Sequence, residues 1–259
     1  MEKLFGKYGL PLDVAFCKKC TMNNQRPAST VEFKQTEKEK KQTLAFGKDG
    51  ICDACNYAEM KKSINWKDRH KELEDLCNRF RRNDGRYDVV VPGSGGKDSI
   101  YVSHVLKYKY GMNPLTVTWP PNMYTDIGWQ NFRSWIDAGL ANISFNPNGA
   151  LHRALTINAF LNLLHPFQPF ILGQKQIGPK MALKFGIKLI MYGESQAEDG
   201  NNIDEAYNPI MDLKYFTAED SERENLTLGG LSVGQILELG FSRADLDPYL
   251  PISRSDAVA

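Results

Sequence analysis

The sequence predicts an α/β protein with a parallel sheet, preceded by a small module that contains most of its cysteines. Short apolar runs alternate with longer helix-like segments from residue 87 onward, as in strands joined by crossover helices. A glycine-rich turn separates the first apolar run from the next helix-like segment. Four of the five cysteines form two pairs before residue 56. We expect a module over residues 1–65 and an α/β domain over residues 66–259.

The composition indicates a globular protein without a general affinity for nucleic acid or membranes. Apolar residues make up 42% of the chain, charged residues 24%, and the formal net charge is +1. No stretch approaches the roughly 18 apolar residues of a membrane span. Residues 1–6 lack the apolar core of a signal peptide. We therefore expect a cytoplasmic protein whose thiols stay reduced.

The paired cysteines need an interpretation other than disulfides. Cys17-x-x-Cys20 and Cys52-x-x-Cys55, with about thirty residues between the pairs, suit a zinc-ribbon-like module in which four thiolates hold one Zn²⁺. Such a module buries little apolar area, so the metal would supply its folding energy. A redox or iron–sulfur site and a module without metal are the alternatives. Cys77 lies on an apolar helical pattern and is expected to be buried.

The remaining elements follow in order along the chain. Residues 66–82 form an amphipathic helical pattern, and Asn83-Asp84-Gly85 is a turn signal before the first strand. We expect strands at residues 89–91, 115–119, 143–145 and 189–192. We expect helices at residues 99–110, 129–138 and 150–164, and another that ends over residues 180–185.

Three further segments break this alternation. The sequence His-Pro-Phe-Gln-Pro at residues 165–169 should interrupt the helical pattern. Residues 197–230 are polar and irregular, which suggests a substrate loop or a lid. Residues 232–239 read as a short helix, and residues 251–259 look like a tail.

The residues that end the strands should line one cleft, because parallel strands bring their carboxyl ends to one edge of the sheet. These strand-end residues are 92–94, Thr118 with Trp119, and Gly193 with Glu194. Thr118, Trp119 and Gly193 are candidate nucleotide-binding residues. For Trp119 a stack on adenine and a place in the core are equally compatible with the sequence.

The turn after the first strand has the composition of a phosphate-binding loop. Paired glycines let backbone N–H groups approach phosphate oxygens, and the start of the following helix adds partial positive charge. Lys97 supplies a full charge, Asp98 can reach a Mg²⁺ held by the same phosphates, and Ser99 can cap the helix or donate to an oxygen. The complete candidate loop is Ser94, Gly95, Gly96, Lys97, Asp98 and Ser99.

The details of the loop exclude two common nucleotide motifs. Asp98 separates Lys97 from Ser99, whereas a Walker A loop has Gly-Lys followed directly by Ser or Thr. A dinucleotide-binding fingerprint would need glycine at Asp98 and an acid where the chain has Trp119. The pattern Ser-Gly-Gly-x-Asp-Ser resembles instead the PP-loop of ATP pyrophosphatases, which cleave ATP between the α and β phosphates. The alternative is a tight turn without a ligand.

Both motifs together resemble one family, the bacterial N-acetyl sugar amidotransferases of surface-polysaccharide, lipopolysaccharide and nonulosonic-acid biosynthesis. The likeness covers nearly the whole chain. The matching segments are Cys17-x-x-Cys20, Arg26-Pro27, Gly50-Ile51-Cys52-x-x-Cys55, residues 89–99, Tyr192-Gly193-Glu194 and residues 226–230. Members of this family usually continue well beyond the length of this chain, so the chain is either truncated or a short homologue, and the resemblance does not extend to the sugar and partner surfaces that the further segment would form.

The resemblance implies a fold and a reaction. The fold is a Rossmann-like parallel sheet of the PP-loop, or adenine nucleotide alpha hydrolase-like, type. The reaction is an ATP-dependent and Mg²⁺-dependent conversion of an acetamido group into an acetamidino group, with Lys97, Asp98 and Glu194 as candidate catalytic residues. Glu194 would hold metal or a sugar hydroxyl. Ammonia would come from a separate glutaminase working with a cyclase-like subunit.

Two other functions compete with this one. A tRNA-thiolating PP-loop enzyme also combines this loop with cysteine pairs, but it needs a basic RNA-binding surface and a catalytic cysteine. Arg79, Arg81, Arg82 and Arg86 form only a modest cluster. The other rival is a non-enzymatic zinc-ribbon interaction module with a degenerate nucleotide domain. Lys175 and Lys180 could reach a phosphate or lie on the surface, and the four histidines show no metal-ligand spacing.

Overall fold

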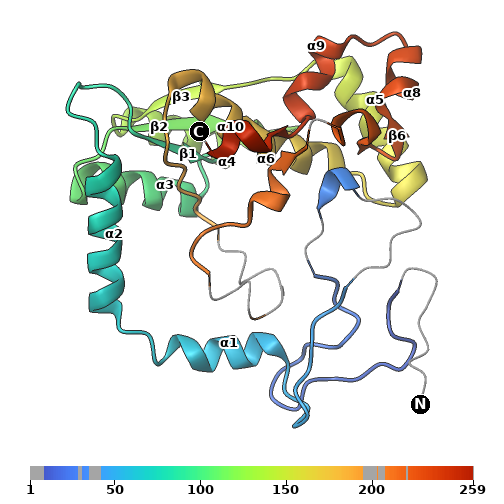
Figure 1. Cartoon of the computed structure of the whole chain (residues 1–259), viewed down its shortest axis with the longest axis horizontal. Coiled ribbons are helices and arrows are strands. Elements are labelled where there is room, and N and C mark those ends of the chain that lie inside the picture. Colours follow the sequence, from blue (N-terminus) through green and yellow to red (C-terminus); the bar gives the residue numbers. More distant parts are fainter. Residues whose placement is uncertain are drawn as a thin grey trace. The chain divides into compact units, whose positions relative to one another are not determined.

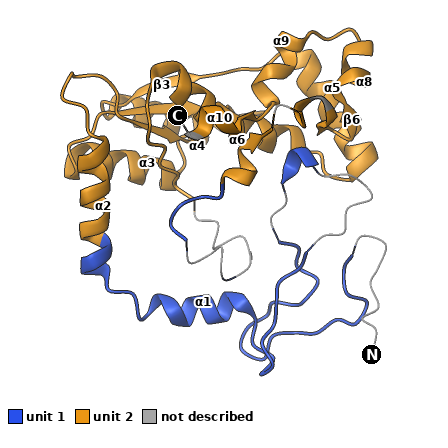
Figure 2. Ribbon diagram, viewed as in Figure 1, with its two compact units in different colours: residues 1–69, 195–212 blue, residues 70–194, 213–259 orange. Residues whose placement is uncertain are grey.

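The computed structural model describes residues 9–28, 31–34, 42–194, 203, 208–219 and 221–258 (Figure 1). The chain divides into two units, coloured separately in Figure 2. The first comprises Met1–Arg69 and Ser195–Asp212, and the second comprises His70–Glu194 and Leu213–Ala259. No helix among the described residues is both long and apolar enough to cross a membrane.

In the first unit, short backbone bridges shape the chain around the paired cysteines. Three isolated antiparallel bridges join Phe16 to Asn23, Pro27 to Thr43 and Phe46 to Cys52. The 3-10 turn η1 (Glu32–Lys34) and helix α1 (Asp53–Lys61) belong to the same unit. Among the described residues of this unit, Cys17, Leu44 and Cys52 form a buried cluster. Two of these three residues are paired cysteines, so this cluster is built around the sulfurs.

Helix α2 (Trp66–Phe80) leads into the second unit and ends two residues earlier than expected. Its buried residue is Cys77, which is 0% exposed. Cys77 packs with Val89 and Val91 of the first strand and with Leu106. The expectation that Cys77 is a buried apolar residue is therefore confirmed.

A parallel sheet lies at the centre of the second unit, as the alternation of elements predicted. Strands β1 (Val89–Pro92), β2 (Pro114–Thr118) and β3 (Ala141–Ser144) pair in that order, with Val90 opposite Leu115 and Leu115 opposite Ala141. The expected strand at residues 189–192 takes the form of a parallel bridge from Ile190 to Val90 on the other side of β1. Since the chain passes from β1 to β2 and β3 on one side and returns on the other, β1 lies at a topological switch point.

Helices connect the strands and differ from their expected bounds in informative ways. Helix α3 (Lys97–His104) starts two residues early and continues as a π-helical turn, η2 (Val105–Lys109). Helices α4 (Asp126–Asp137) and α5 (Gly149–Leu163) are capped by the side chains of Thr125 and Asn148. The interruption expected at residues 165–169 is present, since α5 ends at Leu163 and helix α6 (Gln168–Phe185) starts at Gln168, with Pro169 in its first turn. A proline in the first turn is tolerated because its missing N–H would have no partner inside the helix.

The C-terminal part of the second unit consists of short elements that pair with one another. In chain order they are η4 (Leu213–Tyr215), β4 (Thr217–Ala218), η5 (Arg223–Asn225), β5 (Thr227–Leu228), β6 (Leu231–Ser232), α8 (Val233–Glu238), α9 (Arg243–Leu246), η6 (Asp247–Tyr249), β7 (Ile252–Ser253) and α10 (Arg254–Val258). Strands β5 and β6 form a hairpin, and β4 pairs with β7 in parallel. The irregular segment 197–230 therefore contains ordered pieces, and residues 195–202, 204–207 and 220 lie outside the described part.

The expectation of a tail at residues 251–259 is wrong. Ile252 and Ser253 are 8% and 7% exposed and pair with Thr217 and Ala218. The pairing joins residues 35 positions apart, so no local pattern in the sequence could reveal it.

Candidate functional site

The glycine loop, residues 93–96, joins β1 to α3 and is packed on one side and open on the other. Gly95 has a φ of +85°, and a Cβ placed on it would lie 2.7 Å from the Cα of Phe132. Glycine is required there by both the backbone conformation and the contact. A Cβ placed on Gly96 would meet no atom within 4 Å. The open side of the loop is therefore at Gly96, the residue that precedes the first turn of α3.

The N-terminus of α3 presents polar groups on this open side. The first N–H groups of a helix have no partner within it, and they attract anions together with the helix dipole. Ser94, Lys97 and Asp98 are exposed. The Nζ of Lys97 donates to the carboxylate of Asp98 at 2.8 and 3.0 Å, and the Lys97 side chain is 88% exposed. Both charges are thus accessible to a ligand on the loop.

Ser99 braces the loop and does not cap the helix, which corrects one sequence-based expectation. Because α3 begins at Lys97, its N-cap is Gly96. Ser99 is 8% exposed, and its hydroxyl donates to the Gly96 carbonyl at 3.1 Å. Behind it the Ser103 hydroxyl donates to the Ser99 carbonyl and accepts from the Trp135 indole N–H. This chain of hydrogen bonds holds the first turn of α3 in place.

The segment that follows Ile190 packs directly on this first turn. A Cβ placed on Gly193 would lie 2.8 Å from the carbonyl carbon of Asp98 and 2.8 Å from the nitrogen of Ser99. Gly193 therefore allows two backbones to touch, and Glu194 follows it with an exposed side chain. The structure brings Gly193 and residues 94–99 together, as expected of the carboxyl ends of neighbouring parallel strands.

Thr118 ends β2 and Trp119 follows it, but both side chains are buried in the interior. Thr118 is 0% exposed and its hydroxyl accepts from the Asn142 amide at 2.9 Å. Trp119 is 3% exposed and its ring lies 5.1 Å from that of Tyr249. A Cβ placed on Gly173 would lie 2.2 Å from the indole of Trp119. Of the two roles that the sequence left open for Trp119, the structure shows the core position, and nucleotide binding by these two residues stays a prediction.

Sequence reasoning missed an aromatic cluster that flanks the glycine loop. Phe132 touches Gly95, and the half-exposed ring of Trp129 stacks on Phe132 with centroids 5.6 Å apart. The ring of Tyr124 lies 5.5 Å from that of Trp129. These residues come from the β2–α4 connection and α4. The usable signal was position, since aromatic residues directly after a strand of a parallel sheet lie near its ligand-binding edge.

Two buried hydroxyls near this edge have no hydrogen-bond partner among the described residues. They belong to Tyr124 and Tyr192, and burial raises the pKa of both. A Cβ placed on Gly178 of α6 would lie 2.8 Å from the Pro92 side chain and 3.3 Å from the Tyr192 hydroxyl. Buried polar groups are nearly always satisfied by protein, water or ligand. These hydroxyls therefore have room in their hydrogen bonding for an ordered water or for a polar ligand at the carboxyl edge of the sheet.

The other sequence candidates have local partners. Lys180 pairs with Asp247 at 3.1 Å and its side chain is only 15% exposed, and the Nζ of Lys175 lies 5.1 Å from the centre of the Tyr215 ring. His152 contacts the Tyr249 hydroxyl through Nδ1 at 3.0 Å. Each of the three side chains is therefore held by a contact within the protein.

In the first unit the four paired cysteines converge, as predicted from their spacing. The four Sγ atoms lie within 4.8 Å of one another, with 4.0 Å between Cys17 and Cys55 and 3.6 Å between Cys20 and Cys52. Sulfurs about 2.3 Å from a tetrahedral ion are separated by about 3.8 Å. All four residues are free cysteines. The donor set therefore fits one tetrahedral ion such as Zn²⁺, and it is the single group of this kind found among the described residues.

Backbone N–H groups prepare these sulfurs for a cation. The N–H groups of Lys19 and Cys52 donate to the Cys17 sulfur, each at 3.3 Å. Burial raises the pKa of the Cys17 thiol, but the backbone donors outweigh burial and lower that pKa to about 6. A hydrogen bond with Cys20, followed by burial, raises the pKa of Cys55 to about 12. The thiols of Cys17 and Cys55 therefore differ in how readily they lose a proton. A bound metal ion would favour the deprotonated form of both, because the thiolate is the form that binds metal.

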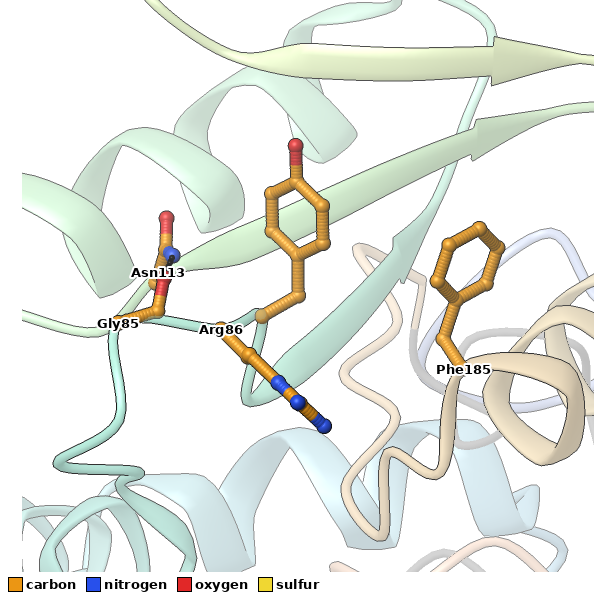
Figure 3. A pocket seen from close by; sticks show the side chains of 5 residues that line it. Gly85, Arg86, Asn113 and Phe185 are labelled. Carbon is orange, nitrogen blue, oxygen red and sulfur yellow. Dashed lines mark hydrogen bonds between the residues drawn. The ribbon is translucent and has the colours of Figure 1, made fainter.

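A pocket of about 420 Å³ lies at the opposite edge of the sheet (Figure 3). It is lined by Gly85, Arg86, Tyr87, Asn113 and Phe185, and the Asn113 amide donates to the Gly85 carbonyl at 3.2 Å. Residues 85–87 precede β1 and Asn113 precedes β2. The pocket therefore opens at the amino ends of the strands, away from the glycine loop.

Comparison with known proteins finds a distant similarity over part of the chain. No protein-family model matches the chain. The chain is similar to "Uncharacterized protein MJ1599" of Methanocaldococcus jannaschii, with 35% identity over 82 residues. The similarity spans 32% of this chain and 29% of that protein. The chain thus covers less than a third of that relative's length.

Proposed function

We propose that the protein is an ATP-dependent amidotransferase that converts the N-acetyl group of a bacterial surface sugar into an acetamidino group. The observation that carries the proposal is the glycine loop at the switch point of the sheet, open at Gly96 and flanked by the exposed charges of Lys97 and Asp98. The loop differs from a Walker A loop because Asp98 lies between Lys97 and Ser99. It therefore best supports a PP-loop type of site, in which ATP adenylates the substrate.

The residues around the loop have distinct roles in this proposal. The first-turn N–H groups of α3 and the ammonium of Lys97 bind the β and γ phosphates and stabilise the departing pyrophosphate. Asp98 would hold Mg²⁺, and its carboxylate lies 2.8 Å from the Nζ of Lys97, so that both charges would act on the same phosphates. Glu194, exposed beside Gly193, binds the metal ion or a hydroxyl of the sugar.

The chemistry explains why ATP is used. An amide carbon is a poor electrophile because the nitrogen donates its lone pair into the carbonyl group, and the amide oxygen is also a poor leaving group. Transfer of AMP to that oxygen, with release of pyrophosphate, makes it a good one. Ammonia then adds to the carbon, AMP departs with the oxygen, and loss of a proton gives the amidine. Positioning and charge stabilisation account for most of the catalysis in such a step.

The proposal includes a separate source of ammonia and a cytoplasmic location. The four-cysteine cluster occupies four of the five cysteines, and Cys77 is 0% exposed. Among the described residues no cysteine is therefore left as a glutaminase nucleophile. We expect a partner glutaminase, together with a cyclase-like subunit, to deliver ammonia to the site. The burial of Cys77 also disfavours the tRNA-thiolating alternative. Burial raises the pKa of this thiol, and Cys77 is the only cysteine outside the four-cysteine cluster that could carry sulfur.

Mass spectrometry of candidate acetamido sugars tests the proposal. The sugars are incubated with the protein, ATP, Mg²⁺ and ammonium. We expect a product one mass unit lighter, because NH replaces O, together with AMP and pyrophosphate. Lys97→Ala should abolish product formation, whereas the matched surface variant Lys71→Ala should not. Release of AMP without a lighter sugar would support the ATP site but would contradict the amidotransferase assignment.

Glutamine dependence tests the separate partner. The chain by itself should turn over with ammonium and not with glutamine, since it lacks the nucleophile that glutamine hydrolysis needs. Equal turnover with both donors would exclude a separate glutaminase.

A further inference from the structure

Helix α5 exposes an apolar stripe that its own unit does not cover. One face of the helix is buried through Leu151, Leu155 and Ala159, and the turn of the β5–β6 hairpin packs on it at Gly229. The stripe, which we call the α5 stripe, consists of residues that are apolar, more than half exposed and spaced along the outer face of α5 and just beyond it: Ile157, Phe160, Leu161, Leu164 and Phe167.

The composition of α5 indicates a helix buried on both sides. Its sequence from Gly149 to Leu163 contains no acidic residue and no lysine, and its one arginine, Arg153, lies near the start. A helix that is apolar all round is normally surrounded by protein. Here only one side has a partner within the described residues, so the composition points to a second partner for the outer face.

The area of the stripe is large enough for a protein interface. The five side chains are 53%, 54%, 68%, 74% and 62% exposed. With roughly 150–200 Å² for each whole side chain, they expose on the order of 500 Å² of apolar surface. That value lies in the upper range of the largest patches on monomeric proteins, which are often functional. Two such stripes would bury about 1,000 Å² through these five side chains alone, which reaches the lower limit expected of a biological interface.

Leu164 gives an independent indication of a partner. It ends α5 in the left-handed region with a φ of 53°, the one non-glycine residue with positive φ among the described residues. A leucine there costs roughly 1–2 kcal/mol relative to a relaxed backbone, and glycine would remove the cost. The side chain is nevertheless 74% exposed and gains little within its own unit. A strained leucine at the end of an apolar stripe is explained by burial against another surface.

We propose that the α5 stripe is the two-fold interface of a homodimer. A two-fold axis near Phe160 would pack two α5 helices antiparallel, with the same residues contributed by both copies. The stripe is neutral over its length, so no like charges would face one another. Each Arg153 lies about two turns from the axis, which separates the two arginines by about 20 Å. Charge therefore does not oppose self-association, and the buried area supports it.

Sedimentation equilibrium of the whole chain, with light scattering as a second readout, tests the dimer. The wild type should be dimeric at micromolar concentration. Leu161→Asp should raise the dimer dissociation constant at least a hundredfold, because it places two carboxylates in the apolar interface. The control Leu183→Asp changes a 44% exposed leucine of α6 outside the stripe and should leave the dimer intact.

Leu164→Gly keeps the test independent of folding, since glycine relieves the backbone at φ 53°. It should weaken the dimer several-fold while the unfolding temperature of the separated monomer stays the same or rises. A wild type that is monomeric throughout the micromolar range overturns the proposal, and so does capture of a different protein by a monomeric stripe. Dimers that persist in both Leu161→Asp and Leu164→Gly would also reject it.

Discussion

Gly193→Ala tests how the strand-end segment is joined to the glycine loop. The new Cβ would lie 2.8 Å from the carbonyl carbon of Asp98, 2.8 Å from the nitrogen of Ser99 and 3.0 Å from the oxygen of Asp98. All three are backbone atoms in the first turn of α3, so no flexible side chain can move aside. Relief requires the segment around Gly193 and the helix terminus to separate.

The expected loss of stability follows from these contacts. Overpacking of this kind typically costs about 1–3 kcal/mol. Replacing glycine by alanine restores roughly 0.4–1 kcal/mol by restricting the unfolded chain. We therefore expect the free energy of unfolding of the second unit to fall by about 1–2 kcal/mol, which corresponds to a Tm lower by roughly 2–8 °C. Nucleotide affinity should fall as well, since the contact positions the first turn of α3.

Urea unfolding followed by circular dichroism measures the effect. The matched control is Gly149→Ala in the first turn of α5, where a Cβ would meet nothing within 4 Å. The control should be as stable as the wild type or more stable by up to about 1 kcal/mol, because the restriction of the unfolded chain is not offset by a clash. If Gly193→Ala were as stable as the control, the segment would not pack on α3 and the proposed site would lose one of its walls.

Three further predictions follow from the sites described. Lys97→Ala and Asp98→Ala should each abolish formation of AMP and pyrophosphate without loss of stability, because both side chains are exposed. If the wild type released ADP and phosphate instead, the loop assignment would be contradicted. The purified protein should contain about one zinc per chain, and a chelator should unfold the first unit before the second; an iron–sulfur absorbance band or less than half an equivalent of zinc would count against this. Burial lowers the pKa of His152, so its neutral form stabilises the fold above the ordinary histidine pKa of about 6.5 and that stability is lost as the pH falls below it. Unfolding midpoints between pH 7 and pH 5 should therefore fall more in the wild type than in His152→Gln, and parallel curves would refute the assignment.

The sequence by itself determined features that depend on local pattern. Alternation of apolar runs and helical segments predicted the parallel α/β sheet, because each strand or helix must show a buried face in its own residues. The spacing of Cys17 with Cys20 and of Cys52 with Cys55 predicted one cluster, since knuckle turns place paired sulfurs on one side. The glycine loop was visible because its position between a strand and a helix is also local.

Tertiary structure decided the features that depend on contacts between distant residues. Trp119 is a core residue because Gly173 and Tyr249 pack against it. These two residues lie 54 and 130 positions after Trp119 in the sequence. Residues 252 and 253 form a strand only because Thr217 and Ala218 offer an edge. Ser99 braces the loop because α3 starts at Lys97. A residue's neighbours in sequence fix its backbone preference, whereas its burial and its role in a site are set by which surfaces the folded chain brings against it.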